Sequence, residues 1–246
     1  MTKTLILIPS RMAATRLPGK PLFKINDLSI ISHVFKRAEE TNIGEVVVAT
    51  DNQEILADVE KNGGRGILTS NQHKTGTDRI FEAYKKLDIK NIDYILNLQG
   101  DEPDINKEDI INLNNLMINN KSDMGTLAAV IKDDKMLDNK NVVKVITKNS
   151  LVEKFFSTAI NFTRDNLSEN YNNIYHHIGI YSYKVNALEK FVSLSQSKNE
   201  IQNKLEQLRA LDNKIKINVA LAKSSPIGVD TKEDYLAIKK IMEYKL

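Results

Sequence analysis

Short, mostly apolar runs, separated by segments with a helical pattern, constrain the fold of this 246-residue chain most strongly. Three of these runs stand at residues 5–8, 46–50 and 94–98. Strands that are apolar on successive residues, and not on alternate ones, are typical of a sheet covered on both faces. Between the runs, residues 30–38 and 55–59 carry apolar side chains at helical spacing. The first half therefore predicts an α/β fold, a mostly parallel sheet with helices on both faces.

The second half of the chain predicts more strand and less helix. Its strand candidates are residues 127–131, 142–146, 151–156 and 178–183, with a polar loop at 161–173. We expect helices at 201–211 and 235–242, and in the first half one at 77–87 that begins with Thr77 as its N-cap. The sequence shows no internal repeat and no low-complexity linker. We therefore expect one continuous α/β domain with an inserted mixed-sheet region.

Composition excludes several classes of protein. The absence of cysteine excludes a disulfide scaffold and any cysteine-ligated metal site. No apolar stretch approaches the ~20 residues of a membrane span, and no signal-peptide pattern is present. A net charge of +3 is too balanced to favour nucleic-acid binding. We expect a cytoplasmic protein that binds neither membranes nor nucleic acid.

A basic loop, RMAATRLPGKP at residues 11–21, follows the first apolar run directly. Its cations Arg11, Arg16 and Lys20 suit a polyphosphate, because backbone N–H groups and fixed charges can surround an anion where a strand ends. The alternative is a solvated surface loop. In open α/β sheets ligands bind outside the carboxyl ends of the strands, and polar clusters also follow at 70–79 and 99–104.

Two carboxylates are candidate metal ligands. Asp101 follows the strand at 94–98, and Asp230 follows a strand-like segment at 217–220. A carboxylate near a polyphosphate repels it unless a divalent cation lies between them, so this pairing indicates Mg²⁺. The alternatives are structural, since Asp101 can cap a turn and Asp230 can cap the last helix.

Two further segments offer polar groups to a ligand. In the loop 69–79, Thr75, Gly76 and Thr77 present hydroxyls and backbone donors suited to a ribose, a base edge or a phosphate, although many helix entries look similar. In the strand near 178–183, His177 and Tyr181 share one face. That strand is either a sheet face that recognises a polyhydroxylated ligand or an edge strand with exposed polar residues.

Seven segments occur in the order and spacing of one known family over nearly the whole chain: IPSRMAATRLPGKPL (8–22), VVVATD (46–51), HKTGTDR (73–79), NLQGDEP (97–103), HHIGIYSY (176–183), LEQLR (205–209) and GVDT (228–231). With them the chain resembles the 3-deoxy-manno-octulosonate (Kdo) cytidylyltransferases, also called CMP-Kdo synthetases. The first and fourth segments are specific, whereas LEQLR and GVDT are weak alone. The resemblance implies a nucleotide-diphospho-sugar transferase fold, Rossmann-like with a smaller dimerisation sheet, and a homodimer.

The resemblance also implies a reaction, CTP + Kdo → CMP-Kdo + pyrophosphate, with Mg²⁺, for lipopolysaccharide synthesis. It divides the chain into a nucleotide-binding half, 1–125, and a sugar-binding and dimerisation half, 126–246. The nucleotide would be bound by Ser10, Arg11, Arg16, Lys20, Thr75, Gly76, Thr77, Arg79 and Gln99. Asp101 and Asp230 would bind the metal and, with Lys20, act in catalysis. The sugar acid would meet Gln99, Arg164, His177, Tyr181 and Glu206.

The sequence departs from the family pattern on the sugar side. An arginine that the family has after Phe-Phe-Ser is missing near Thr158, and Arg164 is a possible substitute. Lys198-Asn199-Glu200 stands where the family has Pro-Leu-Glu. Two alternatives to the Kdo reaction follow. One is a cytidylyltransferase for a related sugar acid, such as 8-amino-Kdo or sialic acid. The other is a catalytically silent nucleotide-binding relative.

Overall fold

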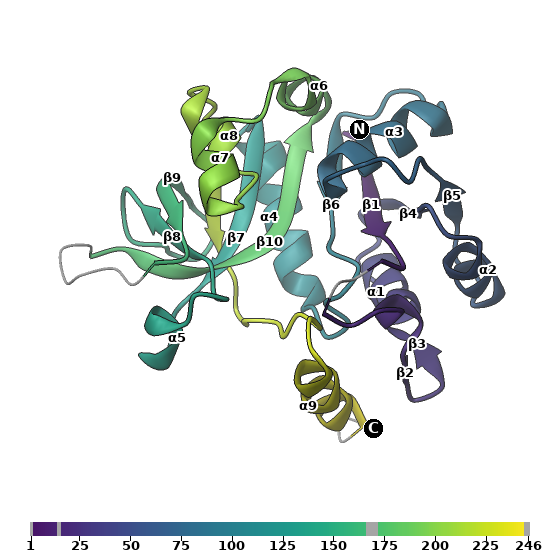
Figure 1. Ribbon diagram of the computed structural model, residues 1–246. Helices are drawn as coiled ribbons and strands as arrows, with labels where there is room; N and C mark the ends of the chain where they lie inside the picture. The colour runs from purple at the N-terminus through teal and green to yellow at the C-terminus, as the bar shows by residue number, and fades with distance from the viewer. Residues whose placement is uncertain (1, 14–15, 166–171, 244–246) are drawn as a thin grey trace. The chain divides into compact units, whose positions relative to one another are not determined.

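The computed structural model describes residues 2–13, 16–165 and 172–243 and divides into two compact units (Figure 1). Unit 1 comprises Met1–Ile110 and Pro226–Leu246, and unit 2 comprises Ile111–Ser225. Residues 14 and 15 of the basic loop, and 166–171 of the expected polar loop, lie outside the described residues. The expected halves, 1–125 and 126–246, have one boundary between them. The chain instead passes from unit 1 to unit 2 after residue 110 and back to unit 1 after residue 225.

The return of the C-terminal segment to unit 1 has a packing reason. Helix α9 (Lys232–Glu243) buries Ile238 and Met242 in a core cluster with Leu17 of the basic loop and Ile25 of strand β2 (Lys24–Ile25). Strand β2 pairs with β3 (Leu28–Ser29). Apolar burial of this kind is the main favourable term in folding, and it fixes residues 226–243 beside the basic loop.

The sheet of unit 1 is parallel and has the strand order β5-β4-β1-β6. Its strands are β1 (Thr4–Ser10), β4 (Gly44–Thr50), β5 (Gly66–Leu68) and β6 (Tyr94–Asn97). Ile6 lies opposite Val46 on one side and Leu96 on the other. Leu5, Ile6, Leu7 and Ile8 are fully buried, as the consecutive apolar pattern predicts.

Three helices pack on this sheet: α1 (Ile30–Glu39), α2 (Gln53–Lys61) and α3 (Gly76–Leu87). Each begins at a side chain that accepts a backbone N–H, namely Ser29, Asn52 and Thr75. The prediction that Thr77 caps α3 is wrong by two residues. The hydroxyl of Thr75 accepts from the N–H of Asp78, whereas Thr77 lies within the helix and is buried.

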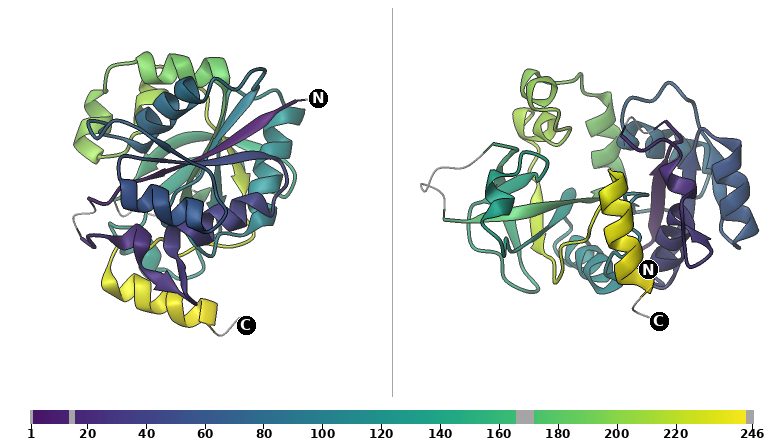
Figure 2. Two further views of the ribbon diagram at one scale, coloured as in Figure 1. Left: turned by 90° about the vertical axis from the view of Figure 1, so that its right-hand side faces the viewer. Right: turned by 60° about the horizontal axis from the view of Figure 1, so that its bottom comes forward.

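Unit 2 has a mixed sheet in the order β10-β7-β11-β9-β8. Its strands are β7 (Met124–Ala129), β8 (Lys144–Thr147), β9 (Phe156–Thr163), β10 (Ile174–Lys184) and β11 (Asn218–Leu221). Only the β7–β11 pair is parallel among the described pairings of this unit. Strand β10 also pairs with β8, so the five strands form a closed ring of pairings, and Figure 2 shows the length of β10 across it.

Two predictions for unit 2 are wrong in their boundaries. Residues 151–155 form no strand, and β9 begins at Phe156 and runs into the segment expected to be a loop. The expected helix at 201–211 is two short helices, α7 (Lys198–Asn203) and α8 (Leu208–Asp212). Lys204 separates them with a left-handed φ of 53°, a conformation that ends a helix.

The remaining helices of the described chain are α4 (Lys107–Asn119), which contains the boundary between the units, α5 (Lys135–Asp138) and α6 (Val185–Ser193). Across residues 2–13, 16–165 and 172–243, no helix has the length and apolar character needed to cross a membrane.

Candidate active site

A pocket of about 330 Å³ lies in unit 1 where β1 and β6 end and α3 begins. The three polar clusters that the sequence places at strand ends meet here, as predicted. Of the expected residues, the pocket is lined by Ser10, Arg11, Arg16, Lys20, Thr75, Gly76, Arg79, Gln99, Asp101 and Asp230. His73 and Lys74, which the sequence reasoning did not select, also line it. Thr77 does not, because it is buried in α3.

Two glycines shape the walls of this pocket. Gly19 has a φ of +76° and precedes Lys20 at the start of a short 3₁₀ helix, Lys20–Leu22. That left-handed conformation favours glycine and turns the basic loop toward the pocket. A Cβ on Gly100 would lie 2.9 Å from the carbonyl oxygen of Pro9, so only glycine lets the chain after β6 pass so close to the end of β1.

The ammonium of Lys20 joins the two candidate metal ligands. Its Nζ lies 2.6 Å from Oδ2 of Asp101 and 3.2 Å from Oδ1 of Asp230, and it donates to the carbonyl of Val229 at 2.7 Å. Burial alone would lower the pKa of Lys20, but the charges and hydrogen bonds of the two carboxylates outweigh it and raise the pKa. Lys20 is therefore a fixed cation between Asp101 and Asp230.

The side chain of Asp230 does not cap the last helix, one of the two roles that the sequence left open. Thr231 and Asp234 form the N-terminal cap of α9, since the Thr231 hydroxyl accepts from the N–H of Asp234 and the Asp234 carboxylate accepts from Thr231. Asp230 contributes only its backbone N–H to this cap, at 3.2 Å. Its carboxylate is instead 2.8 Å from Arg16 and within reach of Lys20.

The donors present fit a hard divalent cation. Asp101 and Asp230 supply carboxylate oxygens that converge on one point, the Nζ of Lys20. Within the described residues, no group of three or more His, Cys, Asp or Glu side chains could hold a metal ion. Two carboxylates without a closed protein cage suit Mg²⁺, which is usually bound by one or two carboxylates together with substrate phosphates and water.

Ser10 and Glu102 leave polar atoms without a hydrogen-bond partner among residues 2–13, 16–165 and 172–243. The buried hydroxyl of Ser10 belongs to the pocket wall, so it can bond to a ligand. Burial, and then the charges of Asp101 and Asp230, raise the pKa of Glu102 to about 8. Glu102 therefore carries a proton at neutral pH. The sequence gives no signal for this state, because it depends on burial.

Two ion pairs position the loop that leads into α3. Arg79 donates to Asp51 at 2.7 Å and to the Thr69 hydroxyl at 2.7 Å, and it is only 3% exposed. Glu82 accepts from the N–H of Ser70 and contacts His73. Despite partial burial, the hydrogen bonds of Lys86, Ser70 and His73 lower the pKa of Glu82 to about 2. Arg79 thus lines the pocket while its guanidinium holds the loop.

In unit 2 the expected sugar-acid residues His177 and Tyr181 are in contact. The Tyr181 hydroxyl is 3.0 Å from Nε2 of His177, and their rings are part of a row that runs from Phe162 to Tyr183. Both side chains are buried, which excludes the exposed edge-strand interpretation. Burial lowers the pKa of His177 to about 3 and raises that of Tyr181 well above its ordinary value. Both groups are neutral at physiological pH.

Glu206 belongs to the same region of unit 2. Its charge acts on Tyr181, and its Oε1 is 3.7 Å from Nη2 of Arg209. Arg209 forms a buried two-pronged ion pair with Glu200 at 2.8 and 2.6 Å. Glu200 also completes a capping box with Ser197. Of the three residues that stand where the family has Pro-Leu-Glu, only the third, Glu200, matches the family pattern, and it is the one that forms these structural contacts.

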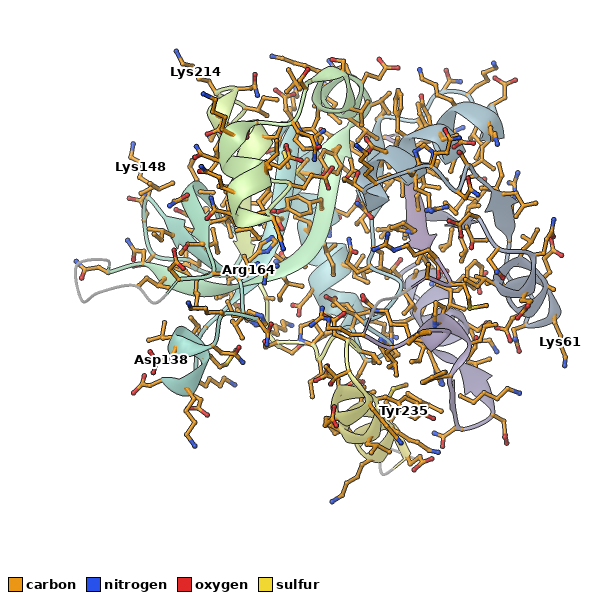
Figure 3. All side chains as sticks on the ribbon, in the orientation of Figure 1. Lys61, Asp138, Lys148, Arg164, Lys214 and Tyr235 are labelled. Atoms are coloured by element: carbon orange, nitrogen blue, oxygen red, sulfur yellow. The ribbon has the colours of Figure 1, made fainter. Side chains whose placement is uncertain are left out.

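Arg164, labelled in Figure 3, follows β9. Its Nη1 donates to the carbonyl oxygens of Lys140 and Asn141 at 3.3 and 3.2 Å. Its charge contributes to the low pKa of His177, after burial and the charge of His176. The structure therefore ties one nitrogen of Arg164 to the loop before β8.

Comparisons with known proteins identify the family of the chain. The model of the cytidylyltransferase family matches residues 5–217. The chain is 44% identical to the 3-deoxy-manno-octulosonate cytidylyltransferase of Nitrobacter hamburgensis, over 98% of this chain and 93% of that protein. It is 45% identical to the enzyme of the same name from Rhodopseudomonas palustris strain BisB18, over 99% of both.

Solved structures are similar over the full length. A CMP:2-keto-3-deoxy-manno-octonic acid synthetase complexed with CTP has a TM-score of 0.90 and 32% identity, with 100% of both chains covered. A UDP-glucose pyrophosphorylase with UDP-glucose has a TM-score of 0.74 at 15% identity, which shows a shared fold alone. The fold is that of the nucleotide-diphospho-sugar transferases. By family model and by relatives aligned over nearly its whole length, the chain belongs to the cytidylyltransferases and, among them, to the 3-deoxy-manno-octulosonate cytidylyltransferase family.

Proposed function

We propose that this protein transfers CMP from CTP to the anomeric hydroxyl of Kdo, releasing pyrophosphate and giving CMP-Kdo for lipopolysaccharide synthesis. The observation that carries the proposal is the Lys20 ammonium held between Asp101 and Asp230 in a pocket lined by Arg11 and Arg16. One pocket thus holds cations that suit a triphosphate and carboxylates that suit the divalent cation accompanying it. We assign the reaction to the cytoplasm, because CTP is a cytoplasmic nucleotide.

Phosphoryl transfer depends mostly on positioning and charge stabilisation, and the residues of unit 1 serve both. Arg11 and Lys20 neutralise charge that grows on the departing pyrophosphate. The Ser10 hydroxyl and the N-terminus of α3, which begins at Gly76, offer uncharged donors to the nucleotide. In unit 2, His177, Tyr181 and Glu206 bind the hydroxyls of the sugar acid, and Arg164 pairs with its carboxylate.

We propose Mg²⁺ as the cofactor, with Asp101 and Asp230 as its protein ligands. When bound, this ion neutralises phosphate oxygens and lowers the pKa of a coordinated hydroxyl. Lys20 lies between both carboxylates, so its ammonium would have to shift for them to hold a metal ion, and it would then be free to contact the phosphates.

Pyrophosphate release from CTP, with a panel of sugar acids and with Mg²⁺ or EDTA, tests the function. We expect Mg²⁺-dependent turnover with Kdo, and turnover with 8-amino-Kdo or sialic acid at a lower kcat/KM. Asp101→Asn should reduce kcat at least about 100-fold with little change in melting temperature. Near-parental turnover by Asp101→Asn would refute the metal assignment. CTP binding without turnover on any sugar acid would instead favour the silent relative.

The homodimer implied by the family is a separate proposal. Unit 2 exposes large apolar side chains, among them Val152 and Ile160 at 52% and 56% and Phe155 at 67%. A contiguous exposed apolar patch marks a protein interface, and we propose that these side chains belong to one. The chain has a mass of 27.9 kDa, and sedimentation of the parent protein should give twice this value. The Phe155→Lys variant should sediment closer to the mass of a single chain. A monomeric parent would contradict the proposal.

A further inference from the structure

Strand β10 contains a bulge directly beside His177. Ile178 lies opposite Leu127 of β7, but the next paired residue is Tyr181, which lies opposite Thr126. The ladder thus advances three residues along β10 for one residue along β7, so β10 holds two extra residues at this point. A bulge interrupts the backbone hydrogen bonds and re-aims the side chains around it, here those of His177 and Tyr181.

The side chain of Thr126 contacts the backbone of β10 at this bulge. Thr126 is fully buried, and its Oγ1 lies 2.7 Å from the carbonyl oxygen of Ile180 and 3.2 Å from that of Ile178. A third contact, at 3.1 Å, joins the same oxygen to Nε2 of His177. One hydroxyl thus connects the bulge to the imidazole.

The proton count at Thr126 determines the tautomer of His177. A hydroxyl has one proton, and a carbonyl oxygen can only accept, so the proton of Thr126 is directed at Ile180 and shared with Ile178. The contact with His177 is then favourable only if Nε2 carries a hydrogen and donates it to Oγ1. Since burial lowers the pKa of His177 to about 3, the ring is neutral and its Nδ1 carries no proton.

This tautomer in turn affects Tyr181. Its hydroxyl oxygen is 3.0 Å from the same Nε2, which as an N–H donor cannot accept the phenolic proton. Burial, together with the nearby charge of Glu206, keeps the pKa of Tyr181 high, so the phenol retains that proton. The side chain of Tyr181 is also hydrogen-bonded to that of Thr126, whose hydroxyl oxygen can accept the phenolic proton.

We propose that Thr126 is a positioning residue of the sugar-acid site, whose hydroxyl holds His177 as the Nε2–H tautomer and fixes the Tyr181 hydroxyl beside it. The proposal rests on the proposed function for the identity of the ligand of that site. The tautomer itself is a property of the free protein and is measured without any substrate.

Histidine ring nitrogens of the ¹⁵N-labelled, ligand-free protein give the first test. The chain has four histidines, and His177→Gln assigns the relevant signals. We expect a protonated Nε2 and a bare Nδ1 in the parent and in Thr126→Ser, which keeps the hydroxyl. Thr126→Val removes the hydroxyl at nearly constant shape, so Tyr181 can donate to Nε2. In that variant the proton should move to Nδ1.

Kinetics give the second test. Thr126→Val should raise KM for Kdo about tenfold, and Thr126→Ser should stay within about twofold of the parent. KM for CTP should stay unchanged in both variants, because the described lining of the nucleotide pocket belongs to unit 1. A general loss of structure would move both KM values or kcat and would not be rescued by serine.

Two results would overturn the proposal. One is a parent protein in which His177 carries its proton on Nδ1. The other is a folded Thr126→Val variant with the parental tautomer and the parental KM for Kdo. If Thr126→Val does not fold, the parent and Thr126→Ser spectra still decide the tautomer. If the parent fails to turn over CTP with Kdo, the proposed function fails, and the ring signals still decide the role of Thr126 toward His177.

Discussion

The Nζ of Lys20 lies 2.6 Å from Oδ2 of Asp101, across 81 residues of sequence. This contact joins the basic loop after β1 to the turn after β6. The same ammonium reaches Asp230, and the backbone N–H of Val229 donates to the carbonyl of Asp101 at 2.9 Å. Three distant segments thus meet around one cation, which lies between the two carboxylates that we propose as metal ligands.

Lys20→Met should therefore tighten metal binding while it reduces catalysis. Removal of the ammonium leaves Asp101 and Asp230 without their cation, so the affinity of the ligand-free protein for Mn²⁺ should rise about tenfold. The kcat for CMP-Kdo formation should fall at least about 100-fold, because the phosphates lose a cation. Calorimetric titration with Mn²⁺ measures the first effect. Weaker binding would show that the two carboxylates do not bind the metal.

Arg16→Met is the matched control for Lys20→Met. Arg16 also pairs with Asp230, but both side chains are about half exposed, so solvent screens their attraction. The affinity for Mn²⁺ should change by less than about threefold. An equal effect of the two substitutions would mean that net charge alone, and not the position of the Lys20 ammonium, controls metal affinity.

Thr231→Ala should destabilise the protein and disturb Asp230. The threonine caps α9, so its loss should reduce the free energy of unfolding by about 1 kcal/mol. The N–H of Asp234 then loses its acceptor, and we expect the neighbouring Asp230 carboxylate to turn toward it in competition with the metal. Thr231→Ser should behave as the parent does. Urea denaturation measures the stability. An unchanged KM for Mg²⁺ in the alanine variant would contradict the predicted disturbance of Asp230.

Glu200→Gln should cost far more stability than Glu206→Gln. Glu200 and Arg209 are each 4% exposed and form a two-pronged ion pair, so loss of the carboxylate leaves a buried guanidinium charge uncompensated, at a cost of about 3 kcal/mol. Glu206 is more exposed and lies 3.7 Å from the same arginine, so its substitution should cost less than about 1 kcal/mol. Equal losses in chemical denaturation would contradict this assignment.

His177 should make the protein less stable as the pH falls. The pKa of this side chain is about 3 in the folded protein, against about 6.5 in an unfolded chain. Between these values the unfolded state binds a proton that the folded state does not, so stability is full above about pH 6.5 and decreases by up to about 1.4 kcal/mol per pH unit below it. His177→Gln should reduce the difference between the free energies of unfolding at pH 7 and pH 5 by about 2 kcal/mol. Parallel curves for parent and variant would contradict a buried neutral His177.

Sequence patterns were sufficient for the parallel half of the fold and for the nucleotide pocket. Consecutive apolar residues such as Leu5–Ile8 have one stable placement, a strand covered on both faces, and the loop after such a strand must open at the ligand edge. The convergence of Lys20 and Asp101 follows from that topology. The choice of Thr231 over Asp230 as helix cap does not follow from it, because both residue types cap helices well.

The second half was less predictable for physical reasons. The break between α7 and α8 depends on the left-handed backbone conformation of Lys204. In a sequence this conformation is indicated mainly by glycine or asparagine, and not by lysine. The proton on Glu102 and the bulge at Gly179 depend on burial and on strand register, which residue types do not encode locally. Thr126 has no functional signal in the sequence, because its role arises only when β7 lies beside β10.

The return of residues 226–243 to unit 1 has a consequence for folding during synthesis. Arg11, Lys20 and Asp101 are made early, whereas Asp230 and the helix that supports it come more than 100 residues later. A nascent chain can thus build the parallel sheet before Asp230 exists, yet it lacks one of the two proposed metal ligands until residues 226–243 fold back. On the proposed metal assignment, a chain that stops before Asp230 transfers no nucleotide.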